Sequence, residues 1–233
     1  MEVQSINDRM AYFAREVRVG DDVEQAADRI CEAAVDLLGG QAQAGITIAH
    51  RERQVESIGA TAELVRRGDE LQAELGQGPC LDAAWDQEQV VVDDLAREAR
   101  WPRWGPRMVQ DFGVKSMLCT QLFTNEKQLG ALNIYSTELV AFDEEAQEVA
   151  RLLAVHAAMA IAQAQQVEGL RFANDRRTTI GKALGIVMVT YDLDDAKAFD
   201  VLRRLSSHEN RKLFDLAQDI INGRQAAPRP PQQ

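Results

Sequence analysis

Cysteine is scarce in this sequence, and its three copies are widely separated: Cys31, Cys80 and Cys119. No two of them form a Cys-x-x-Cys pair, and the histidines show no His-Glu-x-x-His pattern. A disulfide framework needs several paired cysteines, and a zinc site needs ligands at short, regular spacing. The sequence therefore argues against a disulfide-stapled fold and predicts neither a metal site nor any other cofactor.

Long apolar runs are also missing. No stretch approaches the roughly 20 apolar residues that cross a bilayer. The first residues, MEVQSINDRMAYF, combine neither the basic start nor the apolar run of a secretory signal. Together with the few unpaired cysteines, this is typical of a reducing compartment. We expect a soluble, cytoplasmic protein with no membrane partner.

Short motifs of catalysis and nucleotide binding are likewise absent. The sequence contains no Gly-x-Ser-x-Gly, no Walker A motif and no Gly-x-Gly-x-x-Gly. Each of these motifs places a nucleophile or a row of backbone amides for one particular chemistry. We therefore expect a binding protein and not an enzyme.

Acidic charge is plentiful, but it is distributed unevenly along the 233 residues, whose net charge is -11. Residues 1–165 hold 28 acidic and 15 basic side chains, a net charge of -13. Residues 166–233 hold 9 acidic and 11 basic side chains, a net charge of +2. The length fits one large domain or one medium domain plus a small one. Such a step in charge indicates two parts with different roles.

The first part alternates helix and strand patterns. Apolar spacing predicts a helix that stops at Gly39–Gly40, and a second helix that contains Leu64 and Leu75 and ends before GQGPC. Alternation predicts strands in AGITIAH and VESIG, at Val90–Val92, and in the hairpin formed by KSMLCTQLF and LGALNIYS. We expect an antiparallel sheet with helices on one face and a loop-rich cover, including the WPRW stretch, on the other.

A long helix is predicted from Asp143, which is placed to cap it. Leu153, Ala160 and Val167 recur every seven residues with alanines between them. This spacing favours a parallel coiled coil between two subunits, although a helix that simply covers the sheet has a similar stripe. We expect a homodimer formed through Leu153–Leu170 and the helices that follow.

The last part predicts three short helices. The first has one apolar face, the second is capped by DLDD, and the third is capped by Asn210 and ends at Gly223. The residues expected to face inward are Ile180, Leu184, Val187, Met188 and Tyr191, then Ala198, Phe199, Leu202 and Leu205, then Leu213, Leu216, Ala217 and Ile220. AAPRPPQQ is typical of a disordered tail.

In this order the segments resemble a GAF domain followed by an ANTAR domain. The GAF resemblance rests on GQGPCLDAAW, WPRW and LGALNIYS before FDEEA, and the ANTAR resemblance on IGKALGIVM, AFDVLRRLS and NRKLFDLAQDII. It implies an α+β fold, with an antiparallel-sheet GAF domain and flanking helices, a long linking helix and an all-α three-helix C-terminal domain. The expected boundaries are 1–165 for the GAF domain (core 22–142, last helix 143–165), 166–175 for a helical linker, 176–224 for the ANTAR domain and 225–233 for the tail.

What the resemblance implies is a signal-responsive transcription antitermination regulator. In that family, ANTAR modules bind paired RNA hairpins with short loops and prevent a terminator from forming, and dimerisation brings two modules together. GAF domains commonly sense a small molecule or another signal.

Basic residues gather where the second and third C-terminal helices meet, in LRRLSSHENRKL. RNA binding needs cations for phosphates, and polar groups and space for bases. The candidate RNA-binding residues are Lys182, Ala183, Arg203, Arg204, Ser206, Asn210, Arg211 and Lys212. A helix-turn-helix that binds DNA is the nearest alternative, but the third helix offers few base-reading side chains before it turns apolar and acidic in LFDLAQD.

The candidate sensor pocket contains Cys80, Trp101, Trp104 and Cys119. Cys80 precedes a predicted helix, where a thiol pKa can fall, but it also suits a small apolar lining residue. The two tryptophans suit either a pocket cover or plain packing. An alternative hypothesis is a GAF-type free methionine sulfoxide reductase that uses the two cysteines. The cysteine-histidine pair of bilin-binding GAF domains is absent, because Leu81 follows Cys80.

Overall fold

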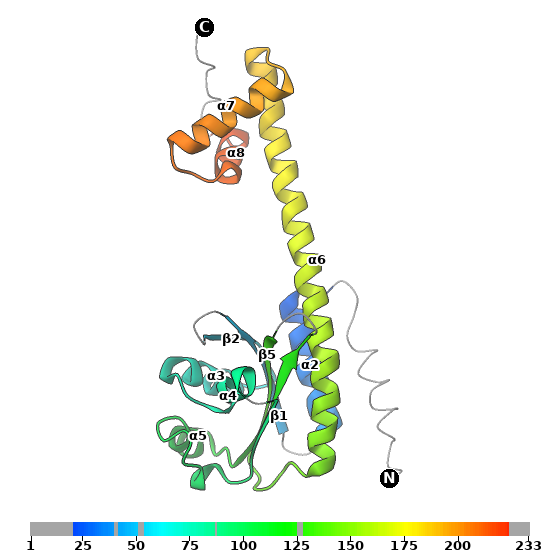
Figure 1. The fold of residues 1–233 in the computed structure, drawn as a ribbon, viewed down its shortest axis with the longest axis vertical. Helices are drawn as coiled ribbons and strands as arrows, with labels where there is room; N and C mark the ends of the chain where they lie inside the picture. Colours follow the sequence, from blue (N-terminus) through cyan, green and yellow to red (C-terminus); the bar gives the residue numbers. More distant parts are fainter. Residues whose placement is uncertain (1–20, 40–41, 51–53, 87, 125–127, 224–233) are drawn as a thin grey trace. The chain divides into compact units, whose positions relative to one another are not determined.

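The computed structural model describes residues 21–39, 42–50, 54–86, 88–124 and 128–223 (Figure 1). The chain divides into two compact units, unit 1 up to Val167 and unit 2 from Glu168. The expected tail at 225–233 lies outside the described residues. Among the helices of the described part, none is long and apolar enough to cross a membrane.

Unit 1 is built on a five-stranded antiparallel sheet with the order β2-β1-β5-β4-β3. The strands are β1 Ala42–Ala49, β2 Val55–Ala60, β3 Gln89–Val92, β4 Ser116–Phe123 and β5 Gln128–Ser136. These are the strands that the alternating pattern predicts, and β1 pairs with β2 as expected. The antiparallel sheet with flanking helices is therefore confirmed.

Helix α2 (Val23–Leu38) and the first half of α6 (Glu144–Tyr191) cover one face of the sheet (Figure 1). Asp22 begins α2 with a capping box, in which its carboxylate accepts from the Gln25 backbone and the Gln25 side chain accepts from the Asp22 backbone. Apolar side chains of both helices pack with those of β1, β4 and β5 in one core. Leu153 belongs to this core and is fully buried.

The opposite face carries helices α3 (Glu63–Leu75), α4 (Pro79–Trp85) and α5 (Gly105–Phe112), with the short 3-10 helix η2 (Leu95–Arg97). The expectation of a loop-rich cover was therefore wrong. The tryptophan and proline residues around α5 made this helix difficult to predict from the sequence. Pro106 nevertheless suits a first helical turn, and Gly113 ends the helix with φ +67°.

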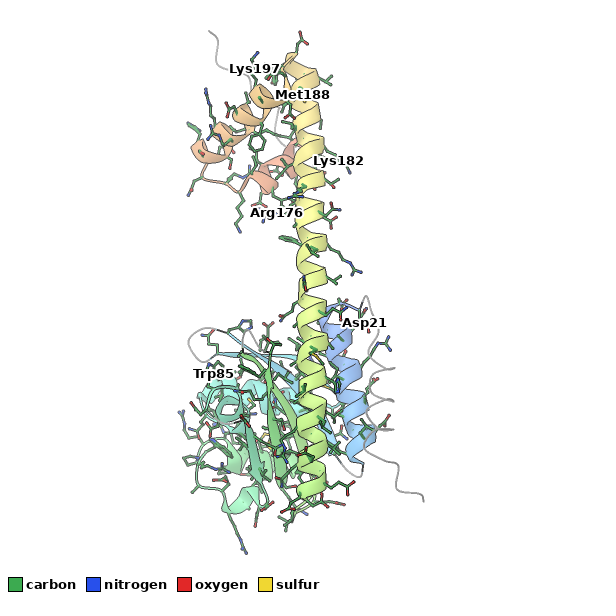
Figure 2. The ribbon with its side chains drawn as sticks, turned by 45° about the vertical axis from the view of Figure 1, so that its right-hand side comes forward. Asp21, Trp85, Arg176, Lys182, Met188 and Lys197 are labelled. Carbon is green, nitrogen blue, oxygen red and sulfur yellow. The ribbon has the colours of Figure 1, made fainter. Side chains whose placement is uncertain are left out.

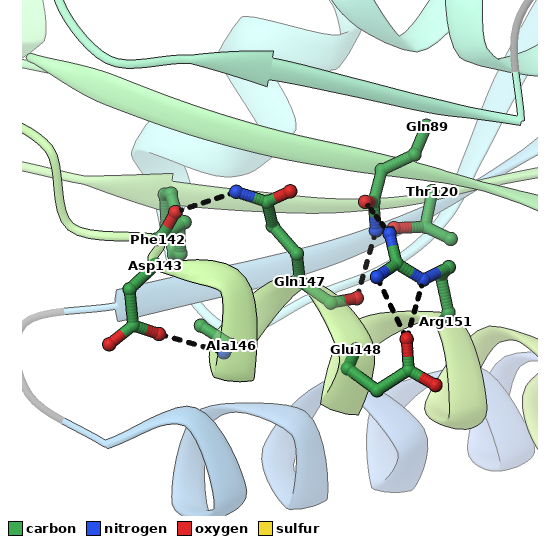
Figure 3. Close-up of polar contacts among 8 residues, drawn as sticks. All are labelled: Gln89, Thr120, Phe142, Asp143, Ala146, Gln147, Glu148 and Arg151. Atoms are coloured by element: carbon green, nitrogen blue, oxygen red, sulfur yellow. Dashed lines mark hydrogen bonds and ion pairs between the residues drawn. The ribbon is translucent and has the colours of Figure 1, made fainter.

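The start of α6 is fixed to the edge strand β3 (Figure 3). Asp143 caps the helix by accepting from the Ala146 backbone N–H at 2.9 Å. Gln89 of β3 donates to the Gln147 carbonyl at 3.1 Å, and its own side-chain oxygen accepts from Arg151 at 2.6 Å. Glu148 completes this contact by pairing with Arg151. The sheet and the first two turns of α6 are thereby joined.

Helix α6 contains 48 residues without interruption. The expected first helix of the C-terminal part is not separate from the long helix, but is its continuation to Tyr191. Asp194 then caps α7 (Asp195–His208), accepting from the Lys197 backbone at 2.8 Å, as the acidic segment predicts. The connection after α7 leads into α8 (Leu213–Ile221).

Unit 2 has its own small core between α6, α7 and α8. It consists of Ala183, Val187, Ala198, Leu202, Leu216, Ala217 and Ile220. Two expectations were wrong. Phe199 is 41% exposed and does not face inward. Asn210 does not cap α8, because it lies in the left-handed region with φ +51° and Lys212 is the N-cap residue.

Candidate functional sites

The four candidate sensor residues lie together in the second core of unit 1, between the sheet and α3, α4 and α5. Cys80, Cys119 and Trp104 are fully buried, and Trp101 is nearly so. The two indole rings meet edge to face at 6.2 Å between centroids. Their N–H groups donate to the Asp82 carboxylate and to the Gly68 carbonyl, each at 3.0 Å. These contacts account for both tryptophans as packed, hydrogen-bonded core residues.

The cysteines of this core are poor nucleophiles. Burial is the largest effect on each thiol, and it raises the pKa of both Cys80 and Cys119 well above the ordinary value. The charge of the nearby Asp69 raises both thiol pKa values further. For Cys80 these effects outweigh the proximity of the α4 N-terminus, which alone would lower the thiol pKa. Both thiols are therefore protonated at neutral pH.

A buried carboxyl group, Asp69 of α3, forms the centre of a polar network in the same core. Its Oδ1 accepts from the Tyr135 hydroxyl at 2.6 Å, from Asn133 Nδ2 at 3.1 Å and from Gln72 Nε2 at 3.5 Å. Its Oδ2 accepts from the Ser57 hydroxyl at 3.5 Å. Burial raises the pKa of Asp69 from 3.8 to about 7, against the lowering effect of the hydrogen bonds from Tyr135 and Asn133.

Asn133 joins this network through one end of its side-chain amide. Its Nδ2 donates to Asp69 and to the Thr47 hydroxyl at 3.3 Å, whereas its buried Oδ1 has no hydrogen-bond partner in the structure. The Asn133 side chain therefore contributes to the network only as a hydrogen-bond donor, and it favours the ionised form of Asp69.

Asp69 is not among the site residues predicted from the sequence, although the spacing of residues in α3 contains a signal for it. The buried residues of α3 are Val65, Gly68, Asp69 and Gln72, spaced as one face of a helix. Leucine positions alone indicate a different face, which is less buried. The close packing of Gly68, where a side-chain carbon would lie 2.8 Å from Met108 and 3.0 Å from the Tyr135 hydroxyl, shows how tightly this face is held.

The predicted RNA-binding residues of unit 2 fall into two groups. The first group is engaged within the protein. Arg203 pairs with Asp200 at 3.0 Å, and Arg211 pairs with Asp219 and with Glu209. The Ser206 hydroxyl donates to the Arg211 carbonyl at 2.6 Å and so closes the connection between α7 and α8. These residues stabilise the connection between α7 and α8, which we call the α7–α8 corner. The second group of residues lies exposed at this corner.

The second group is exposed. Arg204 at the end of α7 and Lys212 at the start of α8 have no ion pair within the described part of the chain, and Asn210 is exposed between the helices. Lys182 is exposed as well, but it projects from the side of α6 away from α7 and α8 (Figure 2). Ala183 is fully buried in the core of unit 2 and cannot touch RNA in this structure.

Comparisons with known proteins agree with the division of the chain into two units. A model of the GAF domain matches residues 20–162, and a model of the ANTAR domain matches residues 168–221. Among curated proteins, none matches the sequence significantly.

Solved structures share the fold of unit 1. The GAF domain of a phosphoenolpyruvate-protein phosphotransferase (ptsP) from Coxiella burnetii is similar with a TM-score of 0.57 and 17% identity, over 72% of this chain and 99% of that chain. The corresponding Acinetobacter GAF domain gives 0.55 and 15%, over 70% and 97%. The free methionine-R-sulfoxide reductase of Neisseria meningitidis gives 0.52 and 17%, over 70% and 89%.

At such low identity these likenesses show the fold alone, and the family comes from the sequence matches. The GAF model covers more than half of the chain. The chain therefore belongs to the GAF-domain family, and its GAF domain is followed by an ANTAR domain, which makes it a regulator with a sensor part and an RNA-binding part.

Proposed function

We propose that the protein is a signal-responsive transcription antiterminator. In this account the GAF domain receives a small-molecule ligand or another signal, and a dimer presents two ANTAR domains to paired RNA hairpins, which prevents a terminator from forming. The observation that carries the proposal is the ANTAR domain itself, with exposed Arg204, Asn210 and Lys212 at one corner of a folded three-helix unit. Cations and amide groups at such a corner suit phosphates and unpaired bases.

The dimer is assigned to a different stripe of α6 from the one that the sequence indicates. Leu153 is used within unit 1, because it packs against the sheet. An exposed groove instead runs beside Val155, Met159, Ala162 and Gln166, with Phe123 at its edge. The four helix positions are spaced by four, three and four residues, as in a coiled-coil seam.

A second copy of the chain is the occupant that this groove fits. Val155, Met159 and Phe123 are each more than half exposed. No charged residue occurs in α6 between Arg151 and Glu168, so two copies of this face can meet without burying a charge. Met159→Glu is expected to give monomers by sedimentation, whereas Val189→Glu, at a still more exposed position of the same helix, is expected to leave the dimer intact. Dimers of Met159→Glu would contradict this assignment.

We also propose that the protein acts without catalytic turnover. Protonated, fully buried thiols at Cys80 and Cys119 do not suit the nucleophilic chemistry of a methionine sulfoxide reductase. Incubation with free methionine sulfoxide and a thiol reductant is expected to give no reduction above a Cys80→Ser control. Turnover that the substitution removes would overturn this part of the proposal.

RNA binding is tested by selecting bound transcripts from cell extract, then comparing a selected hairpin RNA with duplex DNA of the same sequence at one stated salt concentration. Arg204→Glu combined with Lys212→Glu is expected to abolish RNA binding and leave the helical circular dichroism unchanged. Arg107→Glu combined with Lys115→Glu makes the same change of charge on exposed residues of unit 1 and is expected to have little effect. Equal affinity for RNA and duplex DNA would favour the helix-turn-helix alternative.

A further inference from the structure

Two phenylalanines and one arginine form a cluster on unit 2. Phe172 and Arg176 are four residues apart on α6 and so share a helix face, and Phe214 lies in the first turn of α8. The two ring centroids are 6.4 Å apart with the rings tilted by 50°. The guanidinium carbon of Arg176 lies 5.5 Å from each centroid, within the range of a cation–π contact. Figure 2 shows Arg176 on the side of α6 that carries α8.

This aromatic cluster is separate from the apolar core of the unit. Neither phenylalanine belongs to that core or to the apolar residues packed against it. Phe172 is 57% exposed, so most of its ring faces solvent. Core packing therefore does not account for a phenylalanine at position 172, where any long apolar side chain would serve the helix equally well.

Arg176 is held in a different way from the arginines at the α7–α8 corner. Arg203 and Arg211 are held by carboxylates, which offset their charge. Arg176 forms no ion pair with any described residue, and its planar group is positioned by two rings instead. Its charge therefore stays available to a phosphate, while its orientation is already set.

We propose that Phe172, Arg176 and Phe214 form a stacking site for one unpaired base of an RNA loop, with Arg176 facing the adjoining phosphate. Loops expose the flat faces of their bases, and proteins bind these faces with aromatic rings and guanidinium planes. A ring face sets no pattern of hydrogen bonds, so this site recognises that a base is unpaired and does not select its identity. Paired duplexes offer no such face, and the site therefore adds a preference for hairpin loops.

This inference rests on the proposed RNA binding, so the wild-type protein is tested first. The probe is a pool of two-hairpin RNAs with constant stems and short loops of random sequence, from which the full-length protein selects binders. Failure to select any RNA would remove the proposed function and this inference with it. The stacking site is then tested alone, on one RNA that the wild-type protein binds.

Phe172→Leu keeps an apolar side chain but removes the ring. We expect this variant to bind the selected RNA about ten-fold more weakly, because it lacks the ring on which the base stacks. Phe199→Leu is the matched control, since Phe199 is an exposed phenylalanine of α7, and it is expected to bind like the wild type. Phe172→Trp, which restores a flat ring, is expected to recover the affinity.

Replacing each loop nucleotide in turn by an abasic one identifies the stacked base. One replacement is expected to weaken binding by the wild type about ten-fold and to leave binding by Phe172→Leu unchanged, which shows that ring and base act together. If Phe172→Leu binds the selected RNA like the wild type, the inference is overturned although RNA binding stands. The inference is also overturned if every abasic replacement weakens binding by Phe172→Leu as much as it weakens binding by the wild type. The same holds if Phe172→Leu turns the dimer into monomers, because the ring would then belong to the contact between copies.

Discussion

Replacing Asp69 by asparagine tests the physical account of the buried network. Because burial raises the pKa of Asp69 from 3.8 to about 7, the folded protein holds this proton more tightly than the unfolded chain does. The stability that this proton confers is fully present below pH 3.8 and is lost as the pH rises to about 7. The whole effect amounts to about 4 kcal/mol, at about 1.4 kcal/mol for each pH unit between the two pKa values.

Part of this effect falls in an accessible range. Between about pH 5 and about pH 8 the wild-type protein is expected to lose about 2.5 kcal/mol of unfolding free energy through this one group. Asparagine has the same shape and still accepts from Tyr135, but it cannot ionise. Relative to the wild type, Asp69→Asn is therefore expected to gain about 2.5 kcal/mol over the same interval.

The assay is urea unfolding followed by tryptophan fluorescence at a series of pH values. All three tryptophans, Trp85, Trp101 and Trp104, lie in unit 1, so the signal reports the GAF domain and not the ANTAR domain. Asp111→Asn, a change at an exposed carboxyl group, is the matched control and is expected to follow the wild type. Parallel curves for the wild type and Asp69→Asn would refute the reasoning, because they would show that Asp69 does not titrate in this range in the folded state.

Three further outcomes are expected. Gly130→Ala should destabilise unit 1 by at least about 2 kcal/mol in the same urea assay, because a side-chain carbon at this position would lie 1.8 Å from the Thr47 carbonyl oxygen; a stable variant would contradict the register of β1 and β5. Asp194→Ala should lower the thermal midpoint of unit 2 by circular dichroism, since it removes the cap of α7, and Asp194→Ser should restore it. The cysteines should react with a thiol reagent only after unfolding, because all three are buried; rapid reaction in the native state would show that the core opens.

Much of unit 1 follows from its sequence because burial of one face of a strand or helix leaves a regular pattern. Ile46 and Ile48 in β1, and Leu118 and Leu122 in β4, are buried core residues whose period the sequence displays directly. The helices that cover the second face of the sheet were harder to predict from the sequence, because α5 is short and begins among tryptophan and proline residues. Helix α5 is stabilised by the packing of Trp104 and Met108 against residues that are distant in the sequence.

For the candidate sites, the sequence pattern does not indicate which side chains are exposed and which form ion pairs. The basic residues of the α7–α8 corner are visible in the sequence, but which of them are neutralised depends on the fold. Arg211 is held by Asp219 eight residues later, while Arg204 has no such partner among the described residues. Leu153 belongs to the heptad pattern that predicts a coiled coil, but it packs against the sheet of its own unit. Only exposure distinguishes it from Val155 and Met159, which lie on the open side of α6.

We propose that this chain binds RNA hairpins and thereby prevents transcription termination. The most direct measurement is single-round transcription in vitro on a template that places a selected two-hairpin RNA ahead of its terminator. We expect the wild-type protein to increase read-through and the variant that combines Arg204→Glu with Lys212→Glu to leave read-through unchanged. Binding of the RNA without any change in read-through would contradict the account.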